Sequence, residues 1–100
     1  MVTGLADGSG ISLQSVNFPG RYMRVRSNGE VWLDQSDGTS AFNNESTFRR
    51  VAGLADPKRS SYQLWTDASK YLRHSNYFIY GQSGTGAVFE ADATFVETPL

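Results

Sequence analysis

The sequence predicts an all-β fold built from two copies of one unit. Three observations lead to this prediction: a repeated tetrapeptide, short stretches in which apolar and polar residues alternate, and turn-forming residues between those stretches. Alternation with a period of two indicates a strand that is buried on one face. No stretch shows the sustained period of an amphipathic helix, so we expect strands and turns throughout.

The repetition runs along the chain at a nearly constant spacing. The matching pairs are "GLAD" (4–7 and 53–56), "RYMR" (21–24) with "KYLR" (70–73), "VWLDQS" (31–36) with "FIYGQS" (78–83), and "FNNESTF" (42–48) with "FEADATF" (89–95). The spacing falls from 49 to 47 residues, which indicates that one loop is two residues shorter. We therefore divide one domain, residues 1–100, into repeat one (4–52) and repeat two (53–99).

The elements of repeat one can be predicted in chain order. Strands are expected at 11–16 ("ISLQSV"), 21–25 ("RYMRV"), 31–33 ("VWL") and 47–51 ("TFRRV"). The sequences "FPG", "SNGE" and "DGTS" read as turns, because proline fixes φ and glycine tolerates positive φ. Repeat two follows the same order, with "TDASK" in place of the proline–glycine turn. Four short strands per repeat are typical of one lobe of a β-trefoil.

A β-trefoil closes with three lobes, whereas two repeats supply only two of them. A missing lobe would leave unpaired strand edges and apolar faces in water, and both promote association. We expect a homo-oligomer in which chains share lobes and complete one another. A third lobe that was lost or cut away, and an unfamiliar closure with two lobes, are the alternatives.

The composition describes one small globular domain. The chain has 39% hydrophobic and 19% charged residues, a formal net charge of −1 and no cysteine. Near-neutral charge disfavours general nucleic-acid binding, and the lack of a long apolar run disfavours a membrane span. Without cysteine there are no disulfides, and we expect no metal site and no cofactor. The N-terminal residues do not show the pattern of a signal peptide.

Four linked motifs, "SLQSVNFPGRYMR", "VAGLAD", "YLRHSN" and "ADATF", occur in this order over nearly the whole chain. They resemble the arabinofuranose-binding AbfB domain of α-L-arabinofuranosidases, a family 42 carbohydrate-binding module. The resemblance implies a β-trefoil whose lobes carry pockets for arabinofuranose side chains of plant polysaccharides such as arabinoxylan or arabinan. It also implies an extracellular, non-catalytic, lectin-like module that is accessory to α-L-arabinofuranosidase activity.

The resemblance also implies a set of sugar-binding residues in repeat two. His74 of "YLRHSN" and Asp92 of "DATF" occupy the places that hydrogen-bond sugar hydroxyls in the family. Their neighbours Tyr71, Asn76 and Tyr77 complete the expected site. A carboxylate can accept hydrogen bonds from adjacent hydroxyls, and a neutral imidazole can donate or accept one more.

Repeat one has Val25 and Glu45 at the two matching places. Valine can neither donate nor accept a hydrogen bond, and glutamate carries its carboxylate one methylene farther out. We therefore expect a degenerate site in repeat one, of which Glu45 and Arg26 are the remaining polar residues.

Each of these residues also has a structural interpretation. His74 shares strand parity with Leu72, so it could be a histidine at the rim of the core. Asp92 could cap a turn. Arg24 and Arg73 match between the repeats, which favours a shared structural role such as pairing with a carboxylate. Trp32 is expected in the core.

The sequence does not predict an enzyme. Glycoside hydrolysis needs two carboxylates at a set separation in one cleft, and no convincing pair is present. There is no nucleophile elbow and no phosphate-binding loop. A structural or protein-interaction trefoil with decayed sugar pockets is the alternative to a carbohydrate-binding module.

Overall fold

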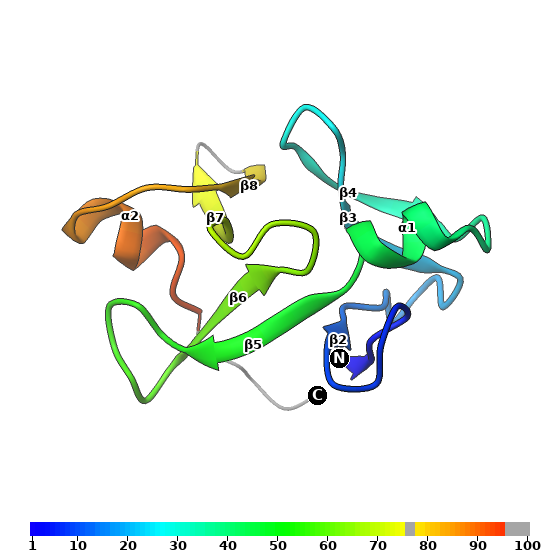
Figure 1. Ribbon diagram of the computed structural model, residues 1–100, viewed down its shortest axis with the longest axis horizontal. Coiled ribbons are helices and arrows are strands. Elements are labelled where there is room, and N and C mark those ends of the chain that lie inside the picture. Colours follow the sequence, from blue (N-terminus) through cyan, green and yellow to red (C-terminus); the bar gives the residue numbers. More distant parts are fainter. Residues whose placement is uncertain (76–77, 96–100) are drawn as a thin grey trace.

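Antiparallel strands make up most of the molecule, which confirms the all-β class, and two short helices join them (Figure 1). The computed structural model describes residues 1–75 and 78–95. The elements in chain order are β1 (Val2–Thr3), β2 (Ile11–Ser12), β3 (Arg21–Val25), β4 (Val31–Gln35), α1 (Ser40–Glu45), β5 (Phe48–Ala52), β6 (Ser60–Leu64), β7 (Tyr71–Ser75), β8 (Phe78–Gln82) and α2 (Ala87–Asp92). We call residues 1–47 the N-terminal half and residues 48–95 the C-terminal half.

The strands form two sheets. The larger has the order β1-β2-β5-β6-β7-β8, and the smaller is the hairpin β3-β4. Gly29 makes the turn of this hairpin at a φ of 86°, a conformation that glycine adopts without steric cost. A hydrogen bond of 2.8 Å from Gly81 N to Gly29 O links the β3-β4 turn to β8. The first and second halves are therefore in direct contact through their hairpins.

The two helices correct the expectation that the chain would be strand and turn throughout. Each has six residues, and they lie within "FNNESTF" and "FEADATF" or just before them. Thr39 begins α1 as its N-cap and accepts a hydrogen bond of 3.1 Å from Phe42 N. Fewer than two turns cannot display a helical period, which is why the sequence pattern missed them. No helix of the described residues is long and apolar enough to cross a membrane.

Each helix is held by one phenylalanine. Phe42 of α1 is fully buried and Phe89 of α2 is 6% exposed. The helices lie at opposite ends of the molecule, α1 beside the β3-β4 hairpin and α2 beside β7 (Figure 1). Each helix therefore brings its C-terminal end close to the middle of a hairpin strand.

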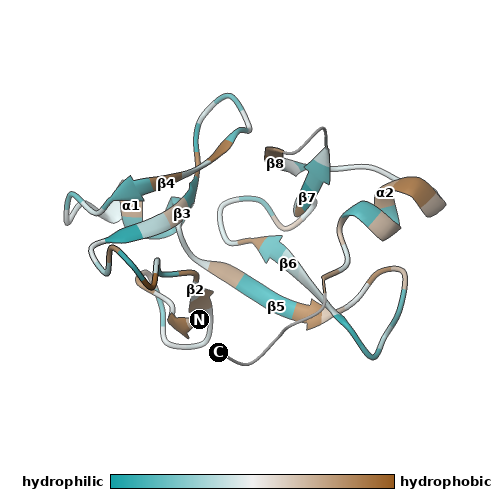
Figure 2. Ribbon diagram, turned by 180° about the vertical axis from the view of Figure 1, so that it is seen from behind, coloured by the Kyte–Doolittle hydropathy of each residue, from teal (hydrophilic) through white to brown (hydrophobic). Residues whose placement is uncertain are grey.

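The core forms where the two halves meet. Its buried residues are Val25, Phe48, Tyr62, Leu64 and Leu72, and the partly buried residues packed against them are Ile11, Leu13, Val31, Ile79 and Phe95. The strand β5 is hydrophobic at both ends and hydrophilic in its middle (Figure 2), because two arginines lie between Phe48 and Val51. Members of the core come from both halves, so neither half buries its apolar face alone.

Hydroxyl groups, of which those of Ser12, Thr47 and Ser61 are buried, hold the two "GLAD" loops by the same set of bonds. In each half, a serine and a threonine accept loop amides at 3.0 Å. The bonds are Leu5 N to Ser12 Oγ, Ala6 N to Thr47 Oγ1, Leu54 N to Ser61 Oγ, and Ala55 N to Thr94 Oγ1. These bonds explain why polar side chains are tolerated in the interior, since an unpaired buried hydroxyl is costly.

Candidate functional site

His74 lies on β7 at the rim of the core. Two residues earlier on the same strand, Leu72 is 2% exposed, whereas the His74 side chain is 57% exposed. One edge of the imidazole faces the ring of Phe95, with 6.2 Å between ring centroids. Its Nε2 atom lies 3.8 Å from Oδ1 of Asp92. The imidazole thus has an apolar wall on one side and a carboxylate on another, and it is open to solvent.

Asp92 is the last residue of α2, and its side chain is 23% exposed. Oδ2 accepts a hydrogen bond from Nη2 of Arg73, while Oδ1 faces His74. The amide that caps the helix is that of Ala93, and it donates to backbone carbonyls. Asp92 therefore pairs with an arginine, and the turn-capping alternative does not describe its carboxylate.

Arg73 also belongs to this site, although the sequence analysis predicted only a structural role for it. Its guanidinium stacks over the ring of Phe89 at 5.2 Å and its Nη1 lies 3.4 Å from Oε1 of Gln82. Its Nε atom is buried and has no hydrogen-bond partner among the residues that the structure describes. Arg73 thus fixes one oxygen of Asp92 and leaves the other toward the imidazole. The available signal was that Arg24 and Arg73, and likewise Glu45 and Asp92, occupy matching places in the repeated motifs, 21 and 19 residues apart.

The N-terminal half has the matching arginine pair with a different acid. Arg24 stacks over Phe42 at 5.3 Å, as Arg73 does over Phe89. Arg24 donates from Nε and from Nη2 to Oε1 of Glu45, at 3.0 Å and 2.8 Å. Both arginines therefore pair with a carboxylate, as their matching positions suggested.

Val25 stands at the place that His74 has on β7, and it is 8% exposed. It belongs to the core cluster together with Leu64. A methyl group added at Gly81 would lie 2.9 Å from Val25 Cγ1, so Val25 packs tightly against β8. The two matching positions consequently have opposite environments, one buried and one exposed.

Arg26 pairs with Asp34 across the β3-β4 hairpin, with Nε at 3.1 Å from Oδ2 and Nη2 at 2.7 Å from Oδ1. These bonds lower the pKa of Asp34 below its ordinary value, and the Arg26 charge acts in the same direction. The Arg26 guanidinium also stacks over Trp32 at 4.7 Å. The Arg26 guanidinium thus contacts two residues of β4, Asp34 and Trp32.

Glu45 and Arg26, the residues expected in the degenerate site, do line one hollow of about 180 Å³. Val25 lies on its floor, and Lys70, Thr66 and Asp67 reach it from the C-terminal half. Sequence reasoning missed these last three residues, because nothing within one repeat indicates which residues of the other will face it. The hollow is polar and carries both positive and negative side chains.

The remaining predicted residues are not all placed. Tyr71 is half-buried at the start of β7, and alternation along the strand directs it to the face opposite His74. Asn76 and Tyr77 lie outside the described residues. Of the five residues predicted in the C-terminal half, the structure brings His74 and Asp92 together.

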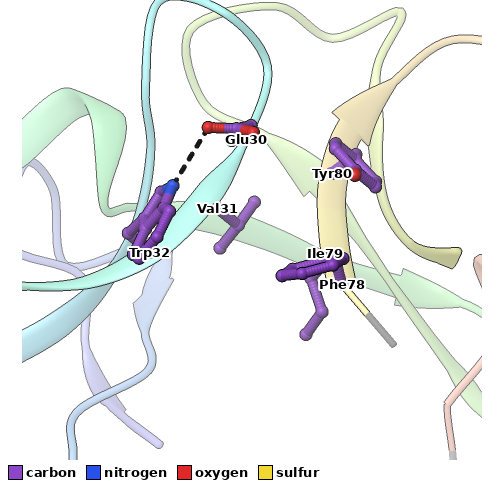
Figure 3. A pocket seen from close by; sticks show the side chains of 6 residues that line it. All are labelled: Glu30, Val31, Trp32, Phe78, Ile79 and Tyr80. Atoms are coloured by element: carbon purple, nitrogen blue, oxygen red, sulfur yellow. Dashed lines mark hydrogen bonds between the residues drawn. The ribbon is translucent and has the colours of Figure 1, made fainter. Parts of the chain in front are cut away.

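Trp32 is 47% exposed, so the expectation that it lies in the core is wrong. Its indole is held from outside by Arg26 and donates to Oε1 of Glu30 at 3.2 Å. Figure 3 shows it on β4, facing Phe78 and Ile79 of β8 across a small hollow. Phe78 is 61% exposed. Strand parity alone could not decide this, because both faces of β4 are largely open.

The geometry can be compared with known proteins. Residues 1–97 match the family model described as the alpha-L-arabinofuranosidase B (ABFB) domain. A probable alpha-L-arabinofuranosidase B of Aspergillus clavatus is 35% identical over 94 residues, and an alpha-L-arabinofuranosidase of Hypocrea jecorina is 36% identical over 93 residues. These alignments cover 93% and 92% of this chain but 18% of each relative.

Solved structures of arabinofuranosidases also resemble this chain. The chain superposes with a TM-score of 0.85 and 32% identity on an arabinofuranosidase complexed with arabinofuranosyl-alpha-1,2-xylobiose, covering 95% of this chain and 21% of that one. An α-L-arabinofuranosidase soaked with a cyclic sulfate inhibitor gives a TM-score of 0.82, at the same identity and coverage. This chain belongs to the family of alpha-L-arabinofuranosidase B (ABFB) domains.

Proposed function

We propose that this chain is a non-catalytic carbohydrate-binding module that recognises arabinofuranose side chains of plant polysaccharides such as arabinoxylan or arabinan. The observation that carries the proposal is the exposed pair of His74 and Asp92, whose Nε2 and Oδ1 atoms are 3.8 Å apart. This separation is too long for a hydrogen bond between them. A sugar hydroxyl between the two groups can donate its one hydrogen to the carboxylate while its oxygen accepts from an imidazole N–H.

The comparisons support the ligand class. The relatives are arabinofuranosidases, and one solved neighbour holds an arabinofuranosyl-xylobiose. This chain spans about a fifth of their length, so it corresponds to a part of those enzymes. We therefore propose that the module is accessory to a catalytic domain and does not itself hydrolyse glycosides. Extracellular action follows from a polysaccharide ligand, and the proposal requires no cofactor, nucleic acid or membrane.

We also propose that the architecture is a β-trefoil with two of its three lobes, repeat one at 4–52 and repeat two at 53–99. The paired loop bonds and the paired arginine–acid contacts support a repeat. Equivalent bridges join Ile11 to Phe48 and Ser60 to Phe95. Matching residues of the two repeats thus carry equivalent loop bonds and bridges, and each repeat has an arginine–acid pair.

Chains would complete one another across an apolar hollow. A hollow of about 160 Å³ is lined by Leu13, Met23, Tyr62, Leu72, Ile79 and Phe95. Tyr62 and Leu72 are buried in the core, whereas Leu13, Ile79 and Phe95 are only partly buried against it. Covering the hollow would remove apolar area from water. Sedimentation of the free chain tests this proposal: homo-oligomers at micromolar concentration support it, and a monomer contradicts it. Several pockets in one oligomer would raise the avidity for a polymer.

Binding is tested by affinity electrophoresis in arabinoxylan, with xylan that lacks arabinose side chains as the reference polymer. We expect retardation in arabinoxylan alone. Loss of one hydrogen bond in His74→Ala costs about 0.5–1.5 kcal/mol, up to roughly tenfold in affinity, and loss of the charged acceptor in Asp92→Ala costs more. Lys58→Ala, on an exposed loop, is the control. Equal mobility of all four proteins in both gels would contradict the proposal.

A structural or protein-interaction module is the second candidate, and one observation favours it. Trp32 and Phe78 are exposed aromatic side chains on facing strands, as is common at protein interfaces. The two candidates differ in a simple measurement. If the chain binds neither arabinoxylan, arabinan nor other pentose or hexose polymers, the interaction module is favoured.

A further inference from the structure

The two matching arginine–acid pairs differ in the number of bonds they make. Arg24 gives two hydrogen bonds to Glu45, from Nε and from Nη2. Arg73 gives Asp92 one, from Nη2, and its buried Nε has no partner among the residues that the structure describes. The two pairs therefore differ at one donor atom, the Nε of the arginine.

The frame around the two pairs is the same. Each arginine lies on the first strand of its hairpin, β3 or β7, and stacks on the phenylalanine of the neighbouring helix, at 5.3 Å and 5.2 Å. Each acid is the last residue of a six-residue helix. What differs is the length of the acid. Glutamate is one methylene longer and reaches Nε as well as Nη2, whereas aspartate stops at Nη2.

This difference decides where the free carboxylate oxygen lies. In the N-terminal half, Oε1 of Glu45 accepts both hydrogen bonds, so the carboxylate is held by two donor atoms of Arg24. The carboxylate of Asp92 accepts from Arg73 at Oδ2, and its Oδ1 faces His74 at 3.8 Å without a direct hydrogen bond. A hydroxyl oxygen can lie about 2.8 Å from both Oδ1 and Nε2 when these atoms are 3.8 Å apart.

We infer that the length of the acid at the end of each short helix decides whether a sugar can bind beside it: aspartate leaves an oxygen for a polyol hydroxyl, and glutamate is held by two donors of its arginine. The inference rests on the proposed function. Arg73 acts here as a positioning residue, because it holds Asp92 and its buried Nε is not open to a ligand. The loss of the N-terminal site then has a second cause besides the valine at position 25.

The experiment combines binding with a readout of the arginine itself. Titration of the ¹⁵N-labelled chain with methyl α-L-arabinofuranoside, followed by ¹⁵N–¹H spectra, reports binding and the Nε–H signals of Arg24 and Arg73 together. In the unchanged protein, we expect a hydrogen-bonded, slowly exchanging Nε–H for Arg24 but not for Arg73. Asp92→Glu is expected to give Arg73 the signal type of Arg24 and to weaken sugar binding at least tenfold. Glu90→Asp, which alters an acid on the same helix, is the matched control.

The outcomes separate the two claims. If the unchanged protein binds the glycoside and Asp92→Glu binds it within twofold, the inference is overturned and the proposed function stands. If Asp92→Glu loses binding while the Arg73 signal stays as it was, capture by arginine is also excluded. If the unchanged protein does not bind, the proposed function fails and the inference fails with it. Loss of binding together with the new Arg73 signal, and full binding by Glu90→Asp, supports the inference.

Discussion

Exchanging the two acids should change the stability of the fold in opposite directions. Asp92→Glu is expected to stabilise it, because the longer side chain reaches the buried Nε of Arg73 that has no partner among the described residues. A hydrogen bond to a charged group contributes about 1.5–3 kcal/mol when it is buried. Arg73 and Asp92 are 21% and 23% exposed, so solvent screening reduces the expected gain to about 1 kcal/mol.

Glu45→Asp is expected to lose a comparable amount. The shorter acid gives up the 3.0 Å bond from Arg24 Nε and keeps that from Nη2. With side chains 30% and 26% exposed, the loss is again about 1 kcal/mol. The combination of both substitutions should return the free energy of unfolding close to its starting value, because separate sites are approximately additive.

Equilibrium unfolding in urea, followed by tryptophan fluorescence, measures these changes. For a chain of this size, 1 kcal/mol corresponds to a shift of roughly 4–8 °C in Tm, so thermal unfolding gives an independent check. Glu90→Asp controls for a general effect of acid length on the helix. Destabilisation by both Asp92→Glu and Glu45→Asp would refute the idea that side-chain length decides whether the acid reaches Nε of its arginine. It would show instead that each pair is packed for the acid it already has.

Three further changes have expected outcomes. Gly81→Ala should destabilise the fold by about 1–3 kcal/mol in urea unfolding, since a methyl group there would lie 2.8 Å from Leu64 and 2.9 Å from Val25; an unchanged midpoint would contradict this packing. Leu72→Ala should cost about 2–5 kcal/mol, because Leu72 is 2% exposed in the core, whereas the exposed Val88→Ala should cost far less. The lowered pKa of Asp34 stabilises the fold fully above the unfolded value of 3.8, and that stability is lost as the pH falls through the folded value. Asp34→Asn should therefore flatten the pH dependence below about pH 4, and an unaltered profile would contradict the role of Arg26.

The sequence predicted the strands better than it predicted the segments between them. The strand β3 lies between the predicted turns "FPG" and "SNGE", β5 begins one residue after the start of the strand expected at 47–51, and β7 repeats β3. The expected strand at 11–16 shortens to Ile11–Ser12, with one further bridge at Gln14. The helices were missed because each is anchored by one phenylalanine and a cap, features that a periodicity test over so few residues cannot detect.

The proximity of His74 and Asp92 was predictable from the linked motifs, and their role in binding a sugar stays a prediction. His74 and Asp92 are separated in sequence, yet the structure places them side by side. The Arg26–Asp34 pair and its contact with Trp32 could not be predicted, because they depend on the register of the β3-β4 hairpin. Exposure of Trp32 is likewise a property of how much of β4 is covered by its neighbours, which local sequence does not encode.

The contrast between His74 and Val25 follows from which neighbour covers each strand. Val25 is pressed against Leu64 and Gly81, which belong to the C-terminal half, so an imidazole there would lie in hydrocarbon. No residue of the described part of the chain covers the His74 side chain in this way, since it is 57% exposed and can face a ligand. A lobe from a second chain that covered β7 as the C-terminal half covers β3 would enclose His74, so sugar affinity should depend on protein concentration if lobes are shared between chains.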